Sequence, residues 1–352
     1  MGTKKESVYK DKVLYAGIDV HKKRWVVTVR SYDLELKTFS ISPIAEELEK
    51  FLMNTYPGAL FHIVYECCFS GFWIYDYFQE RGYNTIVTPT NRIYRDGSIV
   101  KTDKIDSRKL AFQHSRGLLR AVKVPTMKIR EYRSIFRIYD KEKMREGQIL
   151  RQIRCILECK NHEMKWEKWN KAFIEKLKLV RFQEEIFNRK FETLIKEYEF
   201  VKEQIKDTEK RIKEISDDAE LGGRIKRIEQ INGIGIVSAV RLVVYLFDMK
   251  KRFEEGESLV HYVGLTPGEG SSGEEIIRSR TGLIGSGQLR SIIIQLAWVA
   301  VRKDGNLLNK FERVYKNTGC KQKAIVAVAR KLMMKVHAIT EKEEAYEINK
   351  AA

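Results

Sequence analysis

Two apolar runs near the N-terminus each end in an acid, and this arrangement limits how the first third of the chain can fold. Residues 13–18 lead into Asp19, and residues 61–65 lead into Glu66. Short apolar runs of this length predict buried strands. Ligands of α/β sheets gather at the carboxyl ends of the strands. We therefore predict that Asp19 and Glu66 lie at one edge of a sheet and contribute to a site.

Further strands and helices are predicted around these runs. Strand-like stretches occupy residues 24–30, 36–41 and 84–87, whereas residues 44–54, 72–81 and 103–116 have the spacing of helices. Hairpin strands followed by alternating helices and strands predict an α/β domain with a mixed sheet. We assign this domain to residues 1–125.

A second pair of acids opens the predicted helix at residue 103. Asp103 and Asp106 are three residues apart and share a helix face, so they can converge with the two strand-end acids. An all-oxygen cluster favours Mg²⁺ or Mn²⁺ over zinc. Divalent ions of this kind serve in-line displacement at phosphodiesters. One such acid alone would more simply be a surface residue or a helix cap; the four together predict a metal site.

Composition indicates a polyanionic partner. The 352 residues carry a net charge of +18, and residues 278–335 hold 13 Lys and Arg against two acids. This excess favours nucleic acid as the partner. The longest near-continuous apolar stretch, residues 292–301, is too short to span a bilayer. We expect a cytoplasmic protein without a membrane partner, whose five cysteines are reduced thiols.

Residues 126–218 are predicted to be helical. Apolar positions alternate in steps of four and three over four heptads, which favours a coiled coil or a long helical hairpin. A helix packed on its own domain is the alternative. The positions are Phe187, Phe191, Leu194, Tyr198, Val201, Ile205, Thr208, Ile212 and Ile215.

Residues 219–352 are predicted to form a mainly helical domain, with helices at 289–303 and 322–338. The turn Gly233-Ile234-Gly235 before an apolar helix resembles a helix-hairpin-helix element, whose amides can hold a phosphate. A tight turn between helices is the simpler reading. A glycine- and serine-rich loop is predicted at residues 268–273, and it contains Ser271 and Ser272.

The acids occur in an order that resembles a known family. Asp19, Glu66 and the stretch Lys101-Thr102-Asp103 to Asp106-Ser107-Arg108 resemble the DEDD transposases of bacterial insertion sequences, the IS110/IS1111 group, which are relatives of the pilin-gene DNA invertase Piv. The C-terminal third resembles the second domain of the same family, although Asn232 stands where the family usually has proline. The matching pieces are residues 232–235, 253–267, 272–273 and 287–290.

The resemblance implies a fold and an activity. It implies an N-terminal RuvC-like (RNase H-like) domain that holds Mg²⁺ on DEDD, then a coiled-coil segment, then a transposase domain with a nucleophilic serine. That serine aligns with Ser272, with Ser271 as the alternative one residue earlier. Its hydroxyl would attack the scissile phosphate and form a phosphoserine link to DNA. The resemblance also implies a noncoding guide RNA that pairs with donor and target DNA, and a homo-oligomer, dimer or tetramer.

A set of basic residues and glycines is expected to contact nucleic acid. The basic side chains are expected at phosphates, which they bind without reading sequence. The set is Lys101, Lys104, Gly233, Gly235, Arg278, Arg280 and Arg290.

Three alternatives remain at this point. The first is an RNA-independent DNA invertase. The second is a metal nuclease of the Holliday-junction-resolvase type, in which water replaces the serine. The third is a non-catalytic nucleic-acid-binding protein, and the intact acidic set speaks against it.

Overall fold

The computed structural model describes residues 8–90, 93, 102–162, 169–248, 253, 255–266, 269–272, 275–278 and 287–342. For residues 269–272, 275–278 and 341–342 it describes the backbone alone. The chain divides into two compact units, Met1–Pro125 and Thr126–Ala352. The predicted boundary at 125 coincides with this division, and the predicted boundary at 218 falls inside the second unit.

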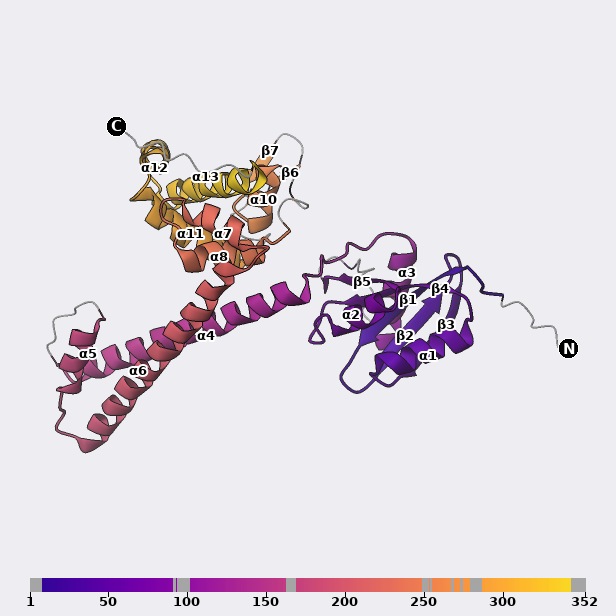
Figure 1. Cartoon of the computed structure of the whole chain (residues 1–352), viewed down its shortest axis with the longest axis horizontal. Coiled ribbons are helices and arrows are strands. Elements are labelled where there is room, and N and C mark those ends of the chain that lie inside the picture. The colour runs from indigo at the N-terminus through magenta and orange to yellow at the C-terminus, as the bar shows by residue number, and fades with distance from the viewer. Residues whose placement is uncertain are drawn as a thin grey trace. The chain divides into compact units, whose positions relative to one another are not determined.

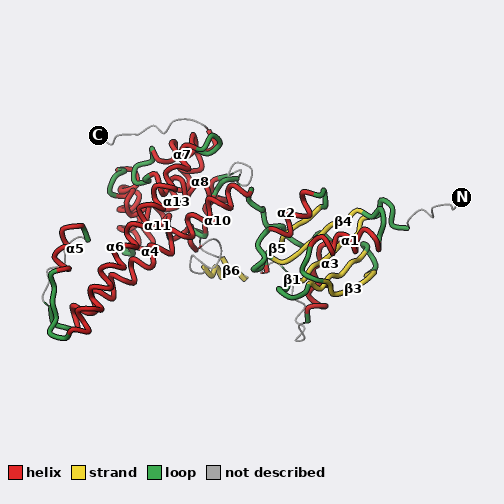
Figure 2. The backbone as a smooth tube through the Cα atoms, turned by 60° about the horizontal axis from the view of Figure 1, so that its bottom comes forward, coloured by secondary structure: helices red, strands yellow, loops and turns green. Residues whose placement is uncertain are grey.

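The first unit is built on a mixed five-stranded sheet, as predicted (Figures 1 and 2). Its strands are β1(Val13–Val20), β2(Trp25–Arg30), β3(Glu35–Ile41), β4(Leu60–Glu66) and β5(Asn84–Thr88). They are ordered β3-β2-β1-β4-β5. Strands β1 to β3 form an antiparallel meander, whereas β4 pairs parallel with β1 and β5 pairs parallel with β4. All five strands correspond to the stretches predicted from sequence.

Helices cover both faces of this sheet, which explains why every residue of β2 is buried. Helices α1(Ala45–Thr55) and α2(Trp73–Glu80) bury their apolar sides on one face, with Leu48, Leu52, Ile74 and Phe78 fully buried there. Helix α3(Asp103–Ser115) packs against β1 and β2. Thr28 of β2 points away from the face of α1 and α2, and its Oγ1 lies 2.9 Å from Ser107 Oγ of α3 in a buried hydrogen bond. Helix α3 therefore covers the opposite face.

The second unit begins with two long helices that lie side by side (Figures 1 and 2). These are α4(Met127–Cys159) and α6(Glu185–Glu214), joined through a segment that contains α5(Lys171–Lys178). The apolar heptad positions of α6 contact other helices of the same chain. They pack on α4 and α5, and Phe191, Tyr198 and Val201 are buried in the core that these three helices form. Ile212 and Ile215, the last of these positions, belong to the next core.

That next core is formed by a mainly helical segment, as predicted. It contains the 3-10 helix η2(Ile215–Asp217), α7(Gly222–Glu229), α8(Ile236–Tyr245), α10(Gly256–Val263), α11(Gly287–Val301), α12(Gly305–Thr318) and α13(Lys321–Lys342). Helices α11 and α13 match the predicted helices, whereas α12 was not predicted.

The glycine- and serine-rich stretch is where the sequence prediction was wrong. A loop was predicted over residues 268–273, but the backbone forms β6(Glu269–Ser272), which pairs antiparallel with β7(Glu275–Arg278). Glycine and serine have low strand propensity, so the composition indicated a loop. Pairing with the Ile276–Ile277 stretch of β7 provides the backbone hydrogen bonds that make β6 a strand.

The start of α4 is tied to the segment before α7 through the nearly buried carboxylate of Asp218. This carboxylate accepts hydrogen bonds from Lys128 Nζ at 2.6 Å, from the Tyr132 hydroxyl at 2.8 Å, and from the amides of Glu220 and Leu221. Burial opposes ionisation of Asp218, but these hydrogen bonds outweigh it and lower its pKa to about 2.

Asp218→Asn is therefore expected to destabilise the protein by roughly 2 kcal/mol at pH 7. Because the folded pKa lies below the ordinary value of 3.8, the stabilisation is fully present well above pH 3.8 and is lost as the pH falls towards 2. At pH 3 the deficit of the variant should be about half its value at pH 7. Urea unfolding of both proteins at the two pH values measures it; an equal deficit at both would contradict this assignment.

Candidate metal site and nucleic-acid contacts

Alternation along two strands aims the strand-end acids at α3. On β1, Leu14, Ala16 and Ile18 face the core shared with α1 and α2, so Asp19 faces the other side. On β4, Tyr65 faces that same core, so Glu66 also faces the side of α3. Because β1 and β4 are parallel neighbours with Ile18 opposite Tyr65, Asp19 near the end of β1 and Glu66 at the end of β4 lie at the same edge of the sheet. The predicted common edge is confirmed by this register.

The start of α3 brings the second pair of acids to the same edge. The Thr102 side chain accepts a hydrogen bond from the Ile105 amide, so Thr102 is the N-cap and Asp103 is free of that role. Asp103 and Asp106 lie in the first turn of α3. Their location at a helix N-terminus also favours their negative charge.

Close packing sets the height of α3 above the sheet. A Cβ built on Gly17 would lie 2.4 Å from the backbone nitrogen of Ala111 and 2.5 Å from the backbone oxygen of Ser107. Only glycine permits this approach. The Gly17-Ile18-Asp19 sequence thus has a structural reason for its glycine, which lets α3 approach β1 two residues before the acid.

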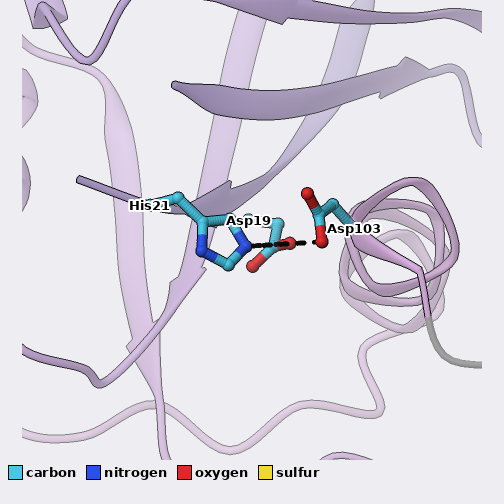
Figure 3. A group of neighbouring side chains, drawn as sticks. All are labelled: Asp19, His21 and Asp103. Atoms are coloured by element: carbon cyan, nitrogen blue, oxygen red, sulfur yellow. Dashed lines mark hydrogen bonds and ion pairs between the residues drawn. The ribbon is translucent and has the colours of Figure 1, made fainter. Parts of the chain in front are cut away.

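Three side chains meet at this edge, and Figure 3 shows how they point towards one another. His21 Nε2 lies 3.0 Å from Asp19 Oδ2 and 3.6 Å from Asp103 Oδ1. Within the described part of the chain, Asp19, His21 and Asp103 form a group whose ligand atoms all lie within 4.8 Å of one another. Asp19 and Asp103 are therefore brought together from positions far apart in the sequence.

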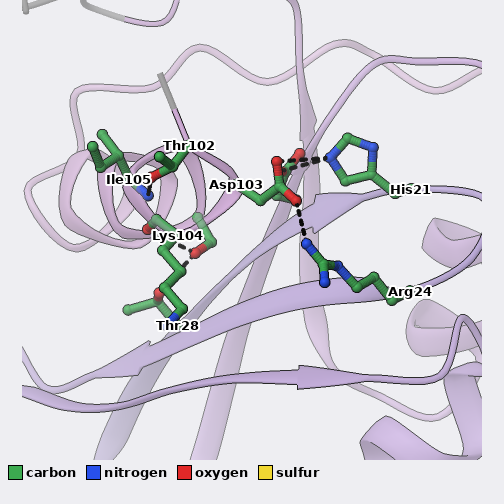
Figure 4. A network of polar contacts seen from close by, with 9 residues as sticks. His21, Arg24, Thr28, Thr102, Asp103, Lys104 and Ile105 are labelled. Carbon is green, nitrogen blue, oxygen red and sulfur yellow. Dashed lines mark hydrogen bonds and ion pairs between the residues drawn. The ribbon is translucent and has the colours of Figure 1, made fainter. Parts of the chain in front are cut away.

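The positive side chain of Arg24 balances part of this negative charge. Arg24 Nη2 donates to Asp103 Oδ2 at 3.1 Å (Figure 4). This hydrogen bond is the main reason that the pKa of Asp103 is lowered. Burial raises the pKa of Asp19; His21 opposes that shift, and the charges of Asp103 and Asp106 add to it. The Asp19 carboxylate is thus held where its negative charge is unfavourable unless a cation is close.

Glu66 and Asp106 are not part of this group of three. Asp106 is close enough for its charge to raise the pKa of Asp19, and Glu66 ends the adjacent strand. The structure therefore brings the four predicted acids to one region and makes direct contacts through Asp19 and Asp103. Sequence reasoning missed His21 and Arg24. His21 follows Asp19 by two residues, the strand period, and this spacing was the available signal.

The donor set fits a hard divalent cation. Four carboxylates surround the edge, and carboxylate oxygens are the preferred ligands of Mg²⁺ and Mn²⁺. The raised pKa of Asp19, partly caused by two neighbouring acids, is the electrostatic condition that a bound cation would relieve. His21 could add a nitrogen ligand, which Mn²⁺ accepts more readily than Mg²⁺.

The predicted nucleic-acid contacts in the second unit have mixed outcomes. Gly233 has φ +97°, and a Cβ there would lie 2.7 Å from the Ala300 Cα of α11, so helix packing already requires this glycine. Gly235 is the N-cap residue of α8, and a Cβ there would meet no atom within 4 Å. Arg290 Nη1 donates to the Gly264 carbonyl at 3.4 Å, which gives this arginine a structural contact.

The other predicted residues that the structure describes belong to α3, β6 and β7. Lys104 is exposed in the first turn of α3. Ser271 and Ser272 lie in β6, opposite Ile276 and Glu275, and Arg278 lies in β7 opposite Glu269, each described by its backbone alone. Lys101 and Arg280 lie outside the described residues.

Comparison with known proteins points to one class. Residues 225–312, from α7 into α12, match the model of the transposase IS116/IS110/IS902 family. The chain is also similar to the transposase for insertion sequence element IS1111A of Coxiella burnetii, with 23% identity over 297 residues, which cover 81% of this chain and 79% of that protein. The chain is thus similar to transposases of IS110-type elements.

The helices in the described part of the chain include none with the length and apolar character needed to span a lipid bilayer.

Gly17→Ala is expected to lift α3 from β1, because the new methyl group meets two backbone atoms that cannot rotate away. Overpacking of this kind typically destabilises by about 1–3 kcal/mol. Thermal unfolding should show a clear loss of stability, and Gly235→Ala, where the added carbon meets open space, serves as the matched control. A Gly17→Ala protein as stable as its parent would show that α3 does not pack on β1 in this way.

Proposed function

We propose that this chain is a transposase that cuts and rejoins DNA at the ends of an insertion sequence. The observation that carries the proposal is the convergence of Asp19 and Asp103 at a strand end beside Glu66 and Asp106. Its likeness to transposases over most of the chain supports the same reaction. Donor and target DNA are then the substrates, and the positive charge of the chain suits both.

In this proposal Asp19, Glu66, Asp103 and Asp106 hold Mg²⁺ or Mn²⁺. The bound ion would neutralise charge on the scissile phosphate and favour ionisation of the attacking hydroxyl. Arg24 holds Oδ2 of Asp103, whereas Oδ1 of Asp103 lies 3.6 Å from His21 Nε2. His21, in contact with both acids, fixes their relative orientation.

The proposed nucleophile is Ser272. Its hydroxyl oxygen loses its proton to water and forms a bond to phosphorus, while the bond from phosphorus to one DNA oxygen breaks. The released DNA oxygen takes up a proton, so that the strand leaves as an alcohol. The protein then carries one DNA end as a phosphoserine until a second strand reverses the step. A serine hydroxyl needs such activation because it is a weak nucleophile at neutral pH. Ser272 is the last residue of β6 and pairs with Glu275 of β7.

Partners complete the proposal. A noncoding RNA would pair with donor and target DNA, and a dimer or tetramer would hold two DNA ends together. These parts are supported by the resemblance of the sequence motifs to RNA-guided members of the group. Lys104, Arg278 and Arg280 are proposed to contact phosphates; the arginine side chain fits a phosphate group particularly well because it can donate two parallel hydrogen bonds.

An RNA-independent invertase is the second candidate. Ribonuclease treatment before a recombination assay separates the two candidates, because only an RNA-guided enzyme loses activity.

Ser272→Ala is expected to abolish the covalent protein–DNA adduct while DNA binding is kept, because the change removes the attacking oxygen alone. Ser271→Ala is the matched control and should form the adduct. Denaturing gel electrophoresis with labelled DNA ends detects the adduct, and a mobility-shift assay measures binding.

Two outcomes would contradict the serine mechanism. The first is an adduct that persists in both single variants and in the double variant. The second is cleavage without any adduct in the parent protein, which would favour the nuclease that uses water.

A further inference from the structure

A cavity lined by cations lies between α10, α12 and α13. Its volume is about 380 Å³, and it is lined by Lys310 of α12 together with Arg330 and Lys331 of α13. Three cations therefore share this cavity with one acid. The remaining lining residues are Glu257, Val260, Ala327 and Met334.

The cations continue beyond the cavity along both helices. Arg313 lies one turn after Lys310 on the same side of α12, and Lys323 lies two turns before Arg330 on the same side of α13. Because a short turn joins the end of α12 to the start of α13, both positions lead from the cavity towards that turn. We call this set the basic stripe, and its members are Lys310, Arg313, Lys323, Arg330 and Lys331.

The basic stripe has no counter-charge within the protein. In the described part of the chain none of its five members forms an ion pair, whereas Lys335 of α13 is neutralised by Asp304 at 2.6 Å. Glu312, the acid of α12, is two residues from Lys310 and so lies on another side of the helix. Neighbouring like charges repel one another. A partner with several negative charges in a row would relieve that repulsion.

The lining of the cavity favours a DNA duplex over other nucleic acids. Its lining residues include no aromatic side chain, although aromatic rings are what unpaired bases stack on. Its apolar part consists of Val260, Ala327 and Met334, whose side chains form no strong hydrogen bond. A ribose 2′-hydroxyl, by which proteins tell RNA from DNA, would find no good partner there. A row of cations alone suits the phosphates of one strand, which it binds without reading sequence.

We propose that the basic stripe binds the phosphates of one strand of a DNA duplex, with a phosphate and its deoxyribose seated in the cavity between α10, α12 and α13. This inference deepens the proposed function and rests on it, because a transposase must hold duplex DNA on either side of the strand break. It assigns a binding role to residues outside the group that performs cleavage.

The salt dependence of duplex binding tests the proposal. Each phosphate contact adds about 0.9 to the slope of log affinity against log salt concentration. Fluorescence anisotropy with a labelled DNA duplex and the full-length protein should give a slope that is shallower by about 1 for Arg330→Gln and for Lys331→Gln. Their affinity at about 0.1 M salt should fall roughly 5- to 10-fold. Glu257→Gln should instead strengthen binding, because it removes the acid that lines the cavity.

Controls separate the basic stripe from general charge and from misfolding. Lys206→Gln makes the same change of charge at an exposed position of α6 and should leave the slope unchanged. Thermal unfolding should give the same midpoint for all these variants, since each replaced side chain is exposed. Ser272→Ala should bind the duplex as the parent does. A parent that forms no covalent adduct would contradict the serine mechanism and leave these slopes as predicted, so the two proposals fail separately.

Two results would overturn the assignment of the basic stripe. One is a slope that Arg330→Gln or Lys331→Gln leaves unchanged. The other is a loss of affinity for an RNA duplex of the same sequence that equals or exceeds the loss for DNA, which would make RNA the partner.

Discussion

The packing of α3 directly on β1 is the interaction on which the candidate site depends. Asp19 belongs to the strand, whereas Asp103 and Asp106 belong to the helix, so their separation is set by how closely the two elements approach. Gly17 provides the space, since backbone atoms of α3 occupy the position that a Cβ would take. The buried hydrogen bond between Thr28 and Ser107 adds a directional contact that fixes the helix along the sheet.

Electrostatics make this arrangement unfavourable for stability and useful for binding. Acids placed together repel one another, and burial of Asp19 adds to the cost of its charge. His21 and Arg24 compensate in part through contacts of 3.0 and 3.1 Å. Such compensation is partial because the side chains of His21 and Arg24 are exposed to water, which weakens their effect. A divalent cation at the same edge would interact with all the acids at once.

Much of this organisation could be predicted from the sequence. Apolar runs identified all five strands of the sheet, because a buried strand requires consecutive or alternating apolar residues. The ends of these runs identified Asp19 and Glu66. Helix α12 was missed although its apolar residues recur at helical spacing, and only Leu307 of its residues is buried. Strand β6 has no strand-like sequence pattern, because its glycine and serine residues become a strand only through pairing with β7. His21 and Arg24 were missed because their role arises from α3, which is brought to them by the tertiary fold.

The most direct test of the account is whether the acids at the end of β1 bind a divalent cation. Titration calorimetry with Mn²⁺ should show binding by the parent protein and by Asp33→Asn, which alters an exposed acid elsewhere in the same unit. The account predicts that Asp19→Asn and Asp103→Asn each weaken Mn²⁺ binding and abolish cation-dependent DNA cleavage, with the fold retained by circular dichroism. Mn²⁺ binding and cleavage that survive both substitutions would contradict it.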